Sequence, residues 1–215
     1  MNDLDCQLAY WNRLGPCKSF HHPVNADRLA QWVSFDDPIL DYGCGYGRVL
    51  GILDGLGYCR LIGVDPAKAM ITEARRRLPG LRFEHCIDPC RLDLEKESIA
   101  AVLLFTVLTC VPTDEGHRAI LREVGRVLRA GGLLYIRDLW LQTDARNVER
   151  YKRDHHKYGT YGVFDLPEGV TVRHQDRQWL EELTAGYDVA VLEDVEIETM
   201  NGHRANGFQW FGAKR

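Results

Sequence analysis

The clearest chemical signal in the sequence is a glycine-rich loop after a short, largely apolar run. Residues 38–42 make up this run, with Asp41 inside it, and Gly43, Gly45 and Gly47 follow at alternate positions. Glycines let the backbone turn sharply and approach a ligand closely, and a helix that starts there presents unpaired N–H groups. In a parallel sheet such a loop lies at the carboxyl ends of the strands. The loop therefore predicts a site for a nucleotide-like ligand.

A carboxylate stands where such a ligand would need one. Asp65 ends the next apolar run, residues 60–64, eighteen residues after Gly47. A carboxylate at this place can accept hydrogen bonds from both ribose hydroxyls of an adenosine. The dinucleotide pattern G-x-G-x-x-G requires a sixth-position glycine, which is Arg48 here. The spacing therefore disfavours a nicotinamide-dependent oxidoreductase.

The elements that must position these residues alternate between strand and helix. Apolar runs predict strands at 38–42, 60–64, 81–86, 99–105 and 133–137, and helical periodicity predicts helices at 46–56, 68–78 and 113–129, the last ended by Gly131-Gly132. The alternation calls for a parallel sheet, with the fully apolar run 99–105 as a central strand.

Beyond Asp138 the pattern changes. A polar stretch runs to 157, a glycine-rich segment covers 158–162, a hairpin is expected up to 173, and a helix from about 178 to 185. The runs 189–200 and 205–213 flank Asn201-Gly202, which favours a tight reversal. We expect them to form an antiparallel pair at one edge of the sheet.

The bulk properties indicate one domain, residues 1–215. A formal net charge of −4 offers no general attraction for nucleic acid or an anionic membrane. The longest apolar run, 99–111, is shorter than the roughly 20 residues of a membrane-spanning helix. We find no signal peptide, and the seven cysteines have no disulfide-like or zinc-like spacing. We therefore expect a cytoplasmic protein with a small-molecule partner; the oligomeric state has no signature in the sequence.

Four segments in order resemble the class I S-adenosylmethionine-dependent methyltransferases, especially the bacterial enzymes that act on small molecules. They are ILDYGCGYGR, LIGVDPAKAM, IAAVLLFTVL and RVLRAGGLLYIRD. The resemblance spans about residues 35–213. It implies a doubly wound, mostly parallel α/β sheet of seven strands with an antiparallel C-terminal pair. It also implies S-adenosylmethionine as the cofactor and a small-molecule acceptor for its methyl group.

The resemblance also implies roles for individual residues. Gly43, Gly45 and Gly47 would line the methionine and ribose portions, Asp41 would hold the loop or the amino group, and Asp65 would bind the ribose. Adenine contacts would come from Pro66, Met70 and Asp88, with Phe105 beside the cofactor. The sequence departs from the family at Ala100, where an acidic residue is frequent, and at Thr109-Cys110, where a polar pair is usual.

Two local motifs suggest narrower families and fail on position or composition. Asp88-Pro89-Cys90 resembles the nucleophile motif of cytosine-C5 methyltransferases, but it precedes the fourth predicted strand, whereas that motif follows it. Phe105-Thr106-Val107-Leu108 is not the Asn/Asp-Pro-Pro-Tyr/Phe signature of amino-group methylation. We interpret the first as a coincidence.

The acceptor side carries no motif. A sulfonium is a good leaving group, so in-line positioning can supply most of the catalysis and a base is optional. Candidate catalytic residues come from segments outside the sheet: Tyr10, His22, Asp138, Tyr161 and His174. We expect residues 1–34 to form a lid segment, with a helix packed on the edge of the sheet as the alternative, and residues 139–174 to form a substrate-side insertion.

Three further points concern the basic residues, the histidines and the rival interpretations. The basic residues Arg146, Arg150, Lys152, Arg153 and Lys157 form either a recognition surface for an acidic acceptor or a solvated helix face. No histidine pair has metal-ligand spacing, so we predict no metal site. Two rival readings use the same cofactor motifs: chemistry that releases methylthioadenosine, and a binding protein without catalysis.

Overall fold

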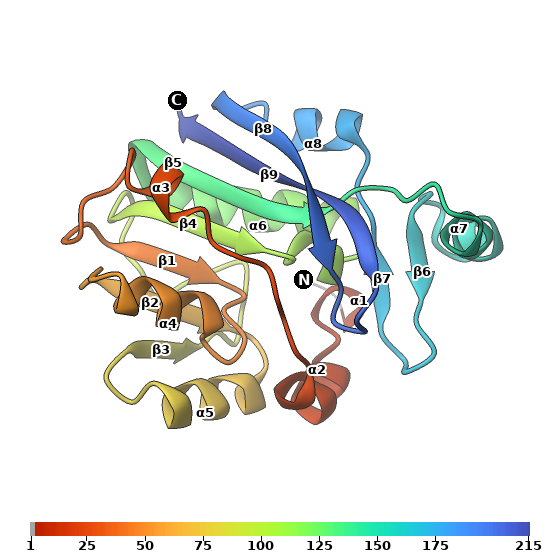
Figure 1. Ribbon diagram of the computed structural model, residues 1–215, viewed down its shortest axis with the longest axis horizontal. Helices are drawn as coiled ribbons and strands as arrows, with labels where there is room; N and C mark the ends of the chain where they lie inside the picture. The colour runs from red at the N-terminus through yellow and green to blue at the C-terminus, as the bar shows by residue number, and fades with distance from the viewer. Residues whose placement is uncertain (1–2) are drawn as a thin grey trace.

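The computed structural model describes residues 3–215 and builds them around a seven-stranded sheet (Figure 1). The strand order is β3-β2-β1-β4-β5-β9-β8. The strands are β1 (Ile39–Tyr42), β2 (Leu61–Asp65), β3 (Arg82–His85), β4 (Ile99–Phe105), β5 (Leu128–Leu139), β8 (Tyr187–Glu198) and β9 (Arg204–Lys214). The first five are parallel, and β9 runs antiparallel to both β5 and β8. The expected sheet and its antiparallel C-terminal pair are confirmed.

Helices cover both faces of this sheet. They are α1 (Asp3–Cys6), α2 (Leu8–Leu14), α3 (Ala26–Leu29), α4 (Arg48–Gly55), α5 (Lys68–Arg77), α6 (Asp114–Val127), α7 (Ala145–Tyr158) and α8 (Arg177–Leu183), with short 3-10 turns η1 (Gly15–Cys17) and η2 (Leu108–Cys110). A small hairpin, β6 (Val163–Asp165) and β7 (Thr171–Arg173), lies beside the sheet, as the sequence predicts. No helix in residues 3–215 is long and apolar enough to cross a membrane.

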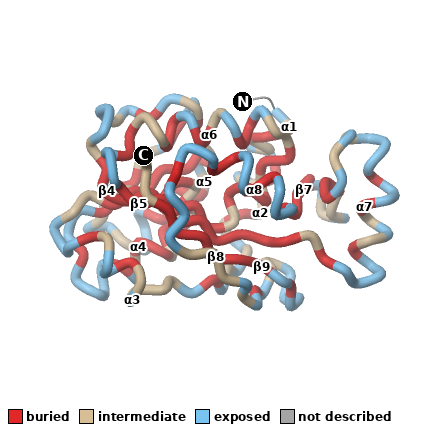
Figure 2. The backbone as a smooth tube through the Cα atoms, turned by 90° about the horizontal axis from the view of Figure 1, so that it is seen from above, coloured by how far each residue is buried: buried red, intermediate tan, exposed pale blue. Residues whose placement is uncertain are grey.

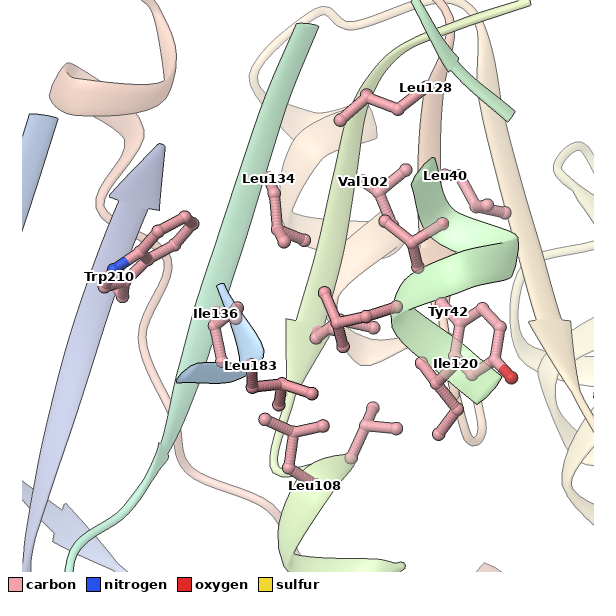
Figure 3. Packing of buried hydrophobic residues seen from close by; sticks show 14 of the residues in the cluster. Leu40, Tyr42, Val102, Leu108, Ile120, Leu128, Leu134, Ile136, Leu183 and Trp210 are labelled. Carbon is pink, nitrogen blue, oxygen red and sulfur yellow. The ribbon is translucent and has the colours of Figure 1, made fainter. Parts of the chain in front are cut away.

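Alternation of side chains along the strands produces two hydrophobic cores. Leu40, Val102, Leu134, Ile136 and Trp210 come from four strands and pack on the face that α6 and α8 cover (Figure 3). The neighbouring positions on the same strands form the second core against α3, α4 and α5. Because both faces are covered, the central strands are buried along their length, and only their ends can offer a ligand site.

The order of the strands decides where that site lies. From β1 the chain proceeds outward to β2 and β3, then returns to β4 on the opposite side of β1. The connections after β1 and β4 therefore leave the sheet in opposite directions. In open parallel sheets this switch opens a crevice at the carboxyl ends of the two strands. The glycine loop follows β1, so it lies at this crevice.

The expected helix 113–129 ends earlier than the sequence suggests. Helix α6 ends at Val127, and Leu128 is already extended and pairs with Ile99 of β4. The glycines 131 and 132 lie within β5 instead of ending the helix. A Cβ on Gly132 would come within 2.8 Å of the Arg129 carbonyl oxygen. Glycine is required there by a close backbone approach, which the sequence does not distinguish from a helix end.

Helix α7 occupies what the sequence shows only as a polar stretch. It is amphipathic, but its buried residues are Asn147, Tyr151 and Asp154, two of which are polar. Periodicity of apolar residues therefore does not reveal it. Asp144 caps the helix by accepting a hydrogen bond from the N–H of Asn147 at 3.2 Å. Figure 2 shows α7 as a largely exposed and half-exposed element at the edge of the molecule, away from the buried sheet.

Replacing Thr113 by alanine should destabilise the fold at the start of α6. Its hydroxyl oxygen accepts a hydrogen bond from Gly116 N–H at 3.0 Å, and its hydroxyl proton goes to Asp5 at 2.8 Å. Loss of a threonine N-cap costs about 1 kcal/mol. Urea unfolding should show this decrease. T72A, which removes an exposed hydroxyl bonded to the Lys68 carbonyl, should stay near the wild type, and equal stability of both variants would contradict the assignment.

Candidate functional site

A first cavity lies at the carboxyl ends of β1, β2 and β4, with an empty volume of about 920 Å³. Gly43 and Gly45 of the loop, Asp65 at the end of β2 and Phe105 at the end of β4 all line it. The parallel sheet brings together here side chains and backbone that lie far apart in the sequence. This is the crevice that the strand order predicts.

The loop requires glycine at two of the lining positions for different reasons. Gly43 has φ +71°, and a Cβ there would lie 2.8 Å from the Val107 side chain. Gly45 has φ +54°, and its Cβ would meet only Met70 within 4 Å, at 3.5 Å. The N–H groups of Gly43 and Cys44 donate to the Val64 carbonyl at 2.8 and 3.0 Å. The loop is therefore held against β2, with open space next to Gly45.

Gly47 has a different environment from the other two glycines. It has φ +84° at the start of α4, and an added Cβ would lie 2.6 Å from the Phe83 ring. It is not among the residues that line the first cavity. Packing of α4 against β3 explains this glycine, and its predicted contact with the methionine or ribose portion stays a prediction.

Two buried carboxylates stand at the loop. Asp65 accepts hydrogen bonds from the N–H groups of Gly45 at 2.9 Å and Ala67 at 2.8 Å. Burial raises the pKa of Asp65 to about 6, although these two N–H groups act in the opposite direction. Asp41 is 2% exposed, and its Oδ2 has no hydrogen-bond partner among residues 3–215. Burial raises the pKa of Asp41 to about 7. Two desolvated carboxyl groups favour a ligand that carries positive charge or hydrogen-bond donors.

Three of the four remaining residues predicted to contact the cofactor line the first cavity. Pro66, Met70 and Phe105 line the first cavity, whereas Asp88 does not. Asp88 is exposed in the loop after β3, and its Oδ1 accepts a hydrogen bond from Cys90 N–H at 2.9 Å. The cavity wall at this point is Pro89. Contact of Asp88 with an adenine stays a prediction that this geometry does not support.

A second cavity adjoins the first, with an empty volume of about 1150 Å³. The two share Trp11 and Phe20 from the N-terminal segment and Thr106 and Cys110 from the connection after β4. The rest of its lining comes mainly from α7, the β6–β7 hairpin and the β8–β9 turn, together with His22, Thr109 and Leu139. A molecule in the second cavity can therefore lie next to a molecule in the first.

Sequence reasoning assigned no role to the two residues after β4 that line both cavities. Thr106 has φ +56°, a left-handed conformation that is uncommon for threonine. Its N–H donates to the Arg137 carbonyl at 2.7 Å, which holds the backbone in this conformation. Their position in the sequence could have indicated a role, because residues that follow a central parallel strand lie at the crevice. No sequence feature marks the backbone conformation of Thr106.

Two of the five candidate catalytic residues line a cavity, and three do not. His22 and His174 line the second cavity, whereas Tyr10, Asp138 and Tyr161 line neither cavity. Tyr10 is buried and its hydroxyl has no hydrogen-bond partner among residues 3–215, and Tyr161 is 41% exposed. Asp138 is 0% exposed and accepts hydrogen bonds from the N–H and hydroxyl of Thr109. These hydrogen bonds connect η2 to β5, which gives Asp138 a structural role.

His174 is neutral and is hydrogen bonded to Tyr151. The Gln142 N–H donates to the Tyr151 hydroxyl oxygen at 3.1 Å, and that hydroxyl lies 2.5 Å from His174 Nδ1. The hydroxyl oxygen has two lone pairs, so the hydroxyl either accepts from Nδ1–H as well or donates its own proton to Nδ1. In the second arrangement the imidazole carries its proton on Nε2. Burial, reinforced by Arg150, lowers the pKa of His174 to about 3. His22 is likewise held neutral, because burial lowers its pKa to about 3.

Polar contacts join the N-terminal segment to the β6–β7 hairpin and the β8–β9 turn, next to these cavities. The Gln7 amide pairs with Thr171 of β7, donating to its carbonyl and accepting from its N–H, both at 2.7 Å. Lys18 Nζ lies 3.1 Å from Glu168 and 2.8 Å from the Asn201 side-chain oxygen, and Asn201 also donates to Glu168 at 2.8 Å. Lys18, Glu168 and Asn201, here called the latch, join three distant segments.

No three His, Cys, Asp or Glu side chains lie together so as to hold a metal ion, within the chain from residue 3 onward.

Comparison with known proteins agrees with this geometry. Residues 40–136 match the family described as Methyltransferase domain. A trans-aconitate 2-methyltransferase of Acidovorax sp. (strain JS42) is 31% identical over 120 residues, 54% of this chain and 44% of that protein. A second one, of Methylobacterium nodulans, is 35% identical over 101 residues, 46% of this chain and 36% of that protein. The matched regions span less than half the length of these relatives.

Among solved structures, a SAM-dependent methyltransferase of Methanosarcina mazei superimposes with a TM-score of 0.79 at 25% identity. The match covers 91% of this chain and 99% of that one. It therefore extends the similarity from the matched domain to nearly the entire chain.

Replacing Asp65 by asparagine should remove a pH-dependent step from cofactor binding. The ionised carboxylate is the better acceptor for ligand hydroxyls, so wild-type affinity for S-adenosylhomocysteine should rise as pH increases through about 6, and rise further through about 7 as Asp41 ionises. In D65N the lower of these two steps should be absent, and affinity at neutral pH should fall about tenfold or more. Calorimetry across pH measures both. D93N, an exposed carboxylate outside both cavities, is the control, and unchanged binding by D65N would place the ribose site elsewhere.

Replacing Lys18 by methionine should loosen the latch. The substitution keeps the aliphatic stem but removes the ammonium group that contacts both Glu168 and Asn201. Amide hydrogen exchange should then accelerate in residues 166–170 and 199–203, because opening of these segments becomes more frequent. K68M, on α5 and outside the latch, should leave both segments at the wild-type rate. Equal rates in K18M and the wild type would contradict a role for Lys18 in closure.

Proposed function

The chain has the domain and the fold of the class I S-adenosylmethionine-dependent methyltransferases, and we propose that it transfers the methyl group of this cofactor to a small-molecule acceptor. The observation that carries the proposal is the pair of adjoining cavities. The first is built from the glycine loop and Asp65, and the second lies beyond the shared wall at Trp11, Phe20, Thr106 and Cys110.

The residues of the first cavity fit S-adenosylmethionine. The buried carboxylate of Asp65 can receive the ribose hydroxyls, and the open side of Gly45 admits a ligand against the backbone. The orphaned Oδ2 of Asp41 provides an acceptor for the ligand's ammonium group. Pro66 and Met70 offer apolar surface for the adenine. These positions correspond to the roles that the family resemblance implies.

Catalysis in this arrangement rests on positioning. When bound, the cofactor supplies a methyl group on a sulfonium, which is a good leaving group. Holding an acceptor in line with that methyl can contribute several kcal/mol to lowering the barrier. Trp11 and Phe20 form an apolar wall at the junction of the cavities and exclude water from it. We assign no general base, since in-line positioning of the acceptor can account for the reaction.

The segments outside the sheet have proposed roles that follow from their places. Residues 1–34 form the lid, of which residues 1–2 lie outside the described part, and residues 139–174 form the acceptor side. The latch and the Gln7–Thr171 pairing support this proposal, since they join the N-terminal segment to the hairpin. A helix packed only on the edge of the sheet would not line both cavities, as Trp11 does.

We further propose a cytoplasmic location and an acceptor that is not a nucleic acid. The seven cysteines have irregular spacings that do not indicate a disulfide framework, as is usual for a protein of a reducing compartment. The formal net charge of −4 provides no general attraction for a polyanion. The second cavity is bordered by α7, the β6–β7 hairpin and the β8–β9 turn, and it suits a small ligand. The two curated relatives are named for a small organic acid, which is consistent with an acceptor of that size.

An assay with isotopically labelled cofactor tests the reaction. The protein is incubated with methyl-deuterated S-adenosylmethionine and a metabolite extract, and products are followed by mass spectrometry. We expect a deuterated metabolite together with S-adenosylhomocysteine, and no product above background from D65A, which lacks the ribose-binding carboxylate. Methylthioadenosine without a labelled acceptor would replace the proposal with the rival chemistry. Cofactor binding without either by-product would indicate a binding protein.

A further inference from the structure

Two arginines of α7 face the second cavity. Arg146 and Arg150 are separated by one helical turn, so they share a face of α7, and both line the cavity. The other basic residues of this helix, Lys152, Arg153 and Lys157, do not line it. The basic stretch in the sequence is therefore divided, with two guanidinium groups on the cavity side and the remaining charges outside.

Arg150 has no carboxylate partner within 4 Å among residues 3–215. Its polar contact is a long hydrogen bond of 3.3 Å to the side-chain oxygen of Asn147, and its guanidinium lies 5.5 Å from the centre of the Phe164 ring. Arg146 has one acidic neighbour, Asp144, at 4.0 Å. The strongest hydrogen bonds of a guanidinium are made to carboxylates and phosphates in a forked geometry. Both groups have that capacity largely unused.

Among residues 3–215, Glu168 is the one acidic residue that lines the cavity, and Lys18 and Asn201 already occupy this carboxylate in the latch. The described residues therefore provide no unpaired negative charge in the cavity to balance these groups. The ring of His174 also lines the cavity, and its Nε2 is a donor in the tautomer that accepts the Tyr151 proton at Nδ1. Phe164, Leu166 and Val172 supply apolar walls next to the charged groups.

We propose that the second cavity binds the acceptor through an anionic oxygen group, a carboxylate or a phosphate, held by Arg150 with Arg146 beside it and His174 as a further donor. This inference rests on the proposed methyl transfer for the word acceptor, but the anion site itself does not depend on it. The apolar walls then take the carbon skeleton, and the shared wall directs the remainder of the molecule toward the first cavity. The acceptor is thus a small organic acid or a phosphate ester.

Calorimetric titration with three probes tests the charge requirement. The probes are propane-1,2,3-tricarboxylate, glycerol 3-phosphate and uncharged glycerol. We expect the wild type to bind at least one of the anions and not glycerol, and the anion that binds identifies the carboxylate or the phosphate source. In R150Q the dissociation constant should rise about tenfold or more. R153Q, an exposed arginine on the same helix outside the cavity, should match the wild type.

Further measurements separate charge from packing and from the proposed reaction. Because Arg150 lies over Phe164, R150Q could disturb α7, so R150K is included; it keeps the charge and should bind the anion more tightly than R150Q. S-adenosylhomocysteine should bind R150Q as it binds the wild type. Failure of both anions to bind the wild type, or equal anion binding by R150Q and the wild type, would overturn the inference. Failure of S-adenosylhomocysteine to bind the wild type would instead overturn the proposed function and leave the anion result standing.

Discussion

Asp65 connects the two parts of the molecule on which the first cavity depends. Its carboxylate, at the end of β2, accepts the N–H of Gly45 in the loop that follows β1, and the N–H of Ala67 that leads into α5. One buried side chain thus fixes the loop against the neighbouring strand and shapes the start of the next helix. Burial raises the pKa of Asp65 to about 6. A ligand with positive charge or several hydrogen-bond donors would therefore stabilise the ionised carboxylate, which burial disfavours.

The second cavity is built on different principles. Most of its walls come from the N-terminal segment, α7, the β6–β7 hairpin and the β8–β9 turn, and the main sheet contributes only strand ends, at Leu139 and Ala205. Polar contacts join these segments, among them the half-buried ion pair of the latch and the pairing of the Gln7 side chain with the Thr171 backbone. Partly exposed ion pairs are individually weak. The sheet therefore holds one ligand site, and segments joined largely by polar contacts hold most of the other.

The two cavities also differ in charge. Carboxylates of Asp41 and Asp65 border the first, whereas Arg146 and Arg150 border the second. The arginines are far from the loop, since α7 lies beyond the hairpin on the side opposite β3 (Figure 1). A cationic methyl donor and an anionic acceptor would each meet the opposite charge. They would then approach one another at the apolar wall formed by Trp11 and Phe20, where little water separates them.

Local patterns were sufficient to predict the cofactor side from the sequence. The glycine loop, Asp65 after the second strand and the continuous apolar run of β4 each depend on residues close together in the chain, and their order determined a doubly wound parallel sheet. The Asn201-Gly202 turn and the β6–β7 hairpin were predictable for the same reason. Backbone conformation and strand burial can be predicted from short stretches of sequence, because they restrict which residue types can follow one another.

Only the tertiary structure decided which way side chains face once distant segments meet. Gly47 packs on Phe83 instead of lining the cavity, and Asp138 is sealed by its bonds to Thr109. His174 is hydrogen bonded to Tyr151 of another element, and Arg150 is separated from the solvated basic residues beside it. Each outcome depends on a neighbour contributed by another element. Exposure, tautomer and charge pairing are properties of such neighbours, which residue type and local spacing do not specify.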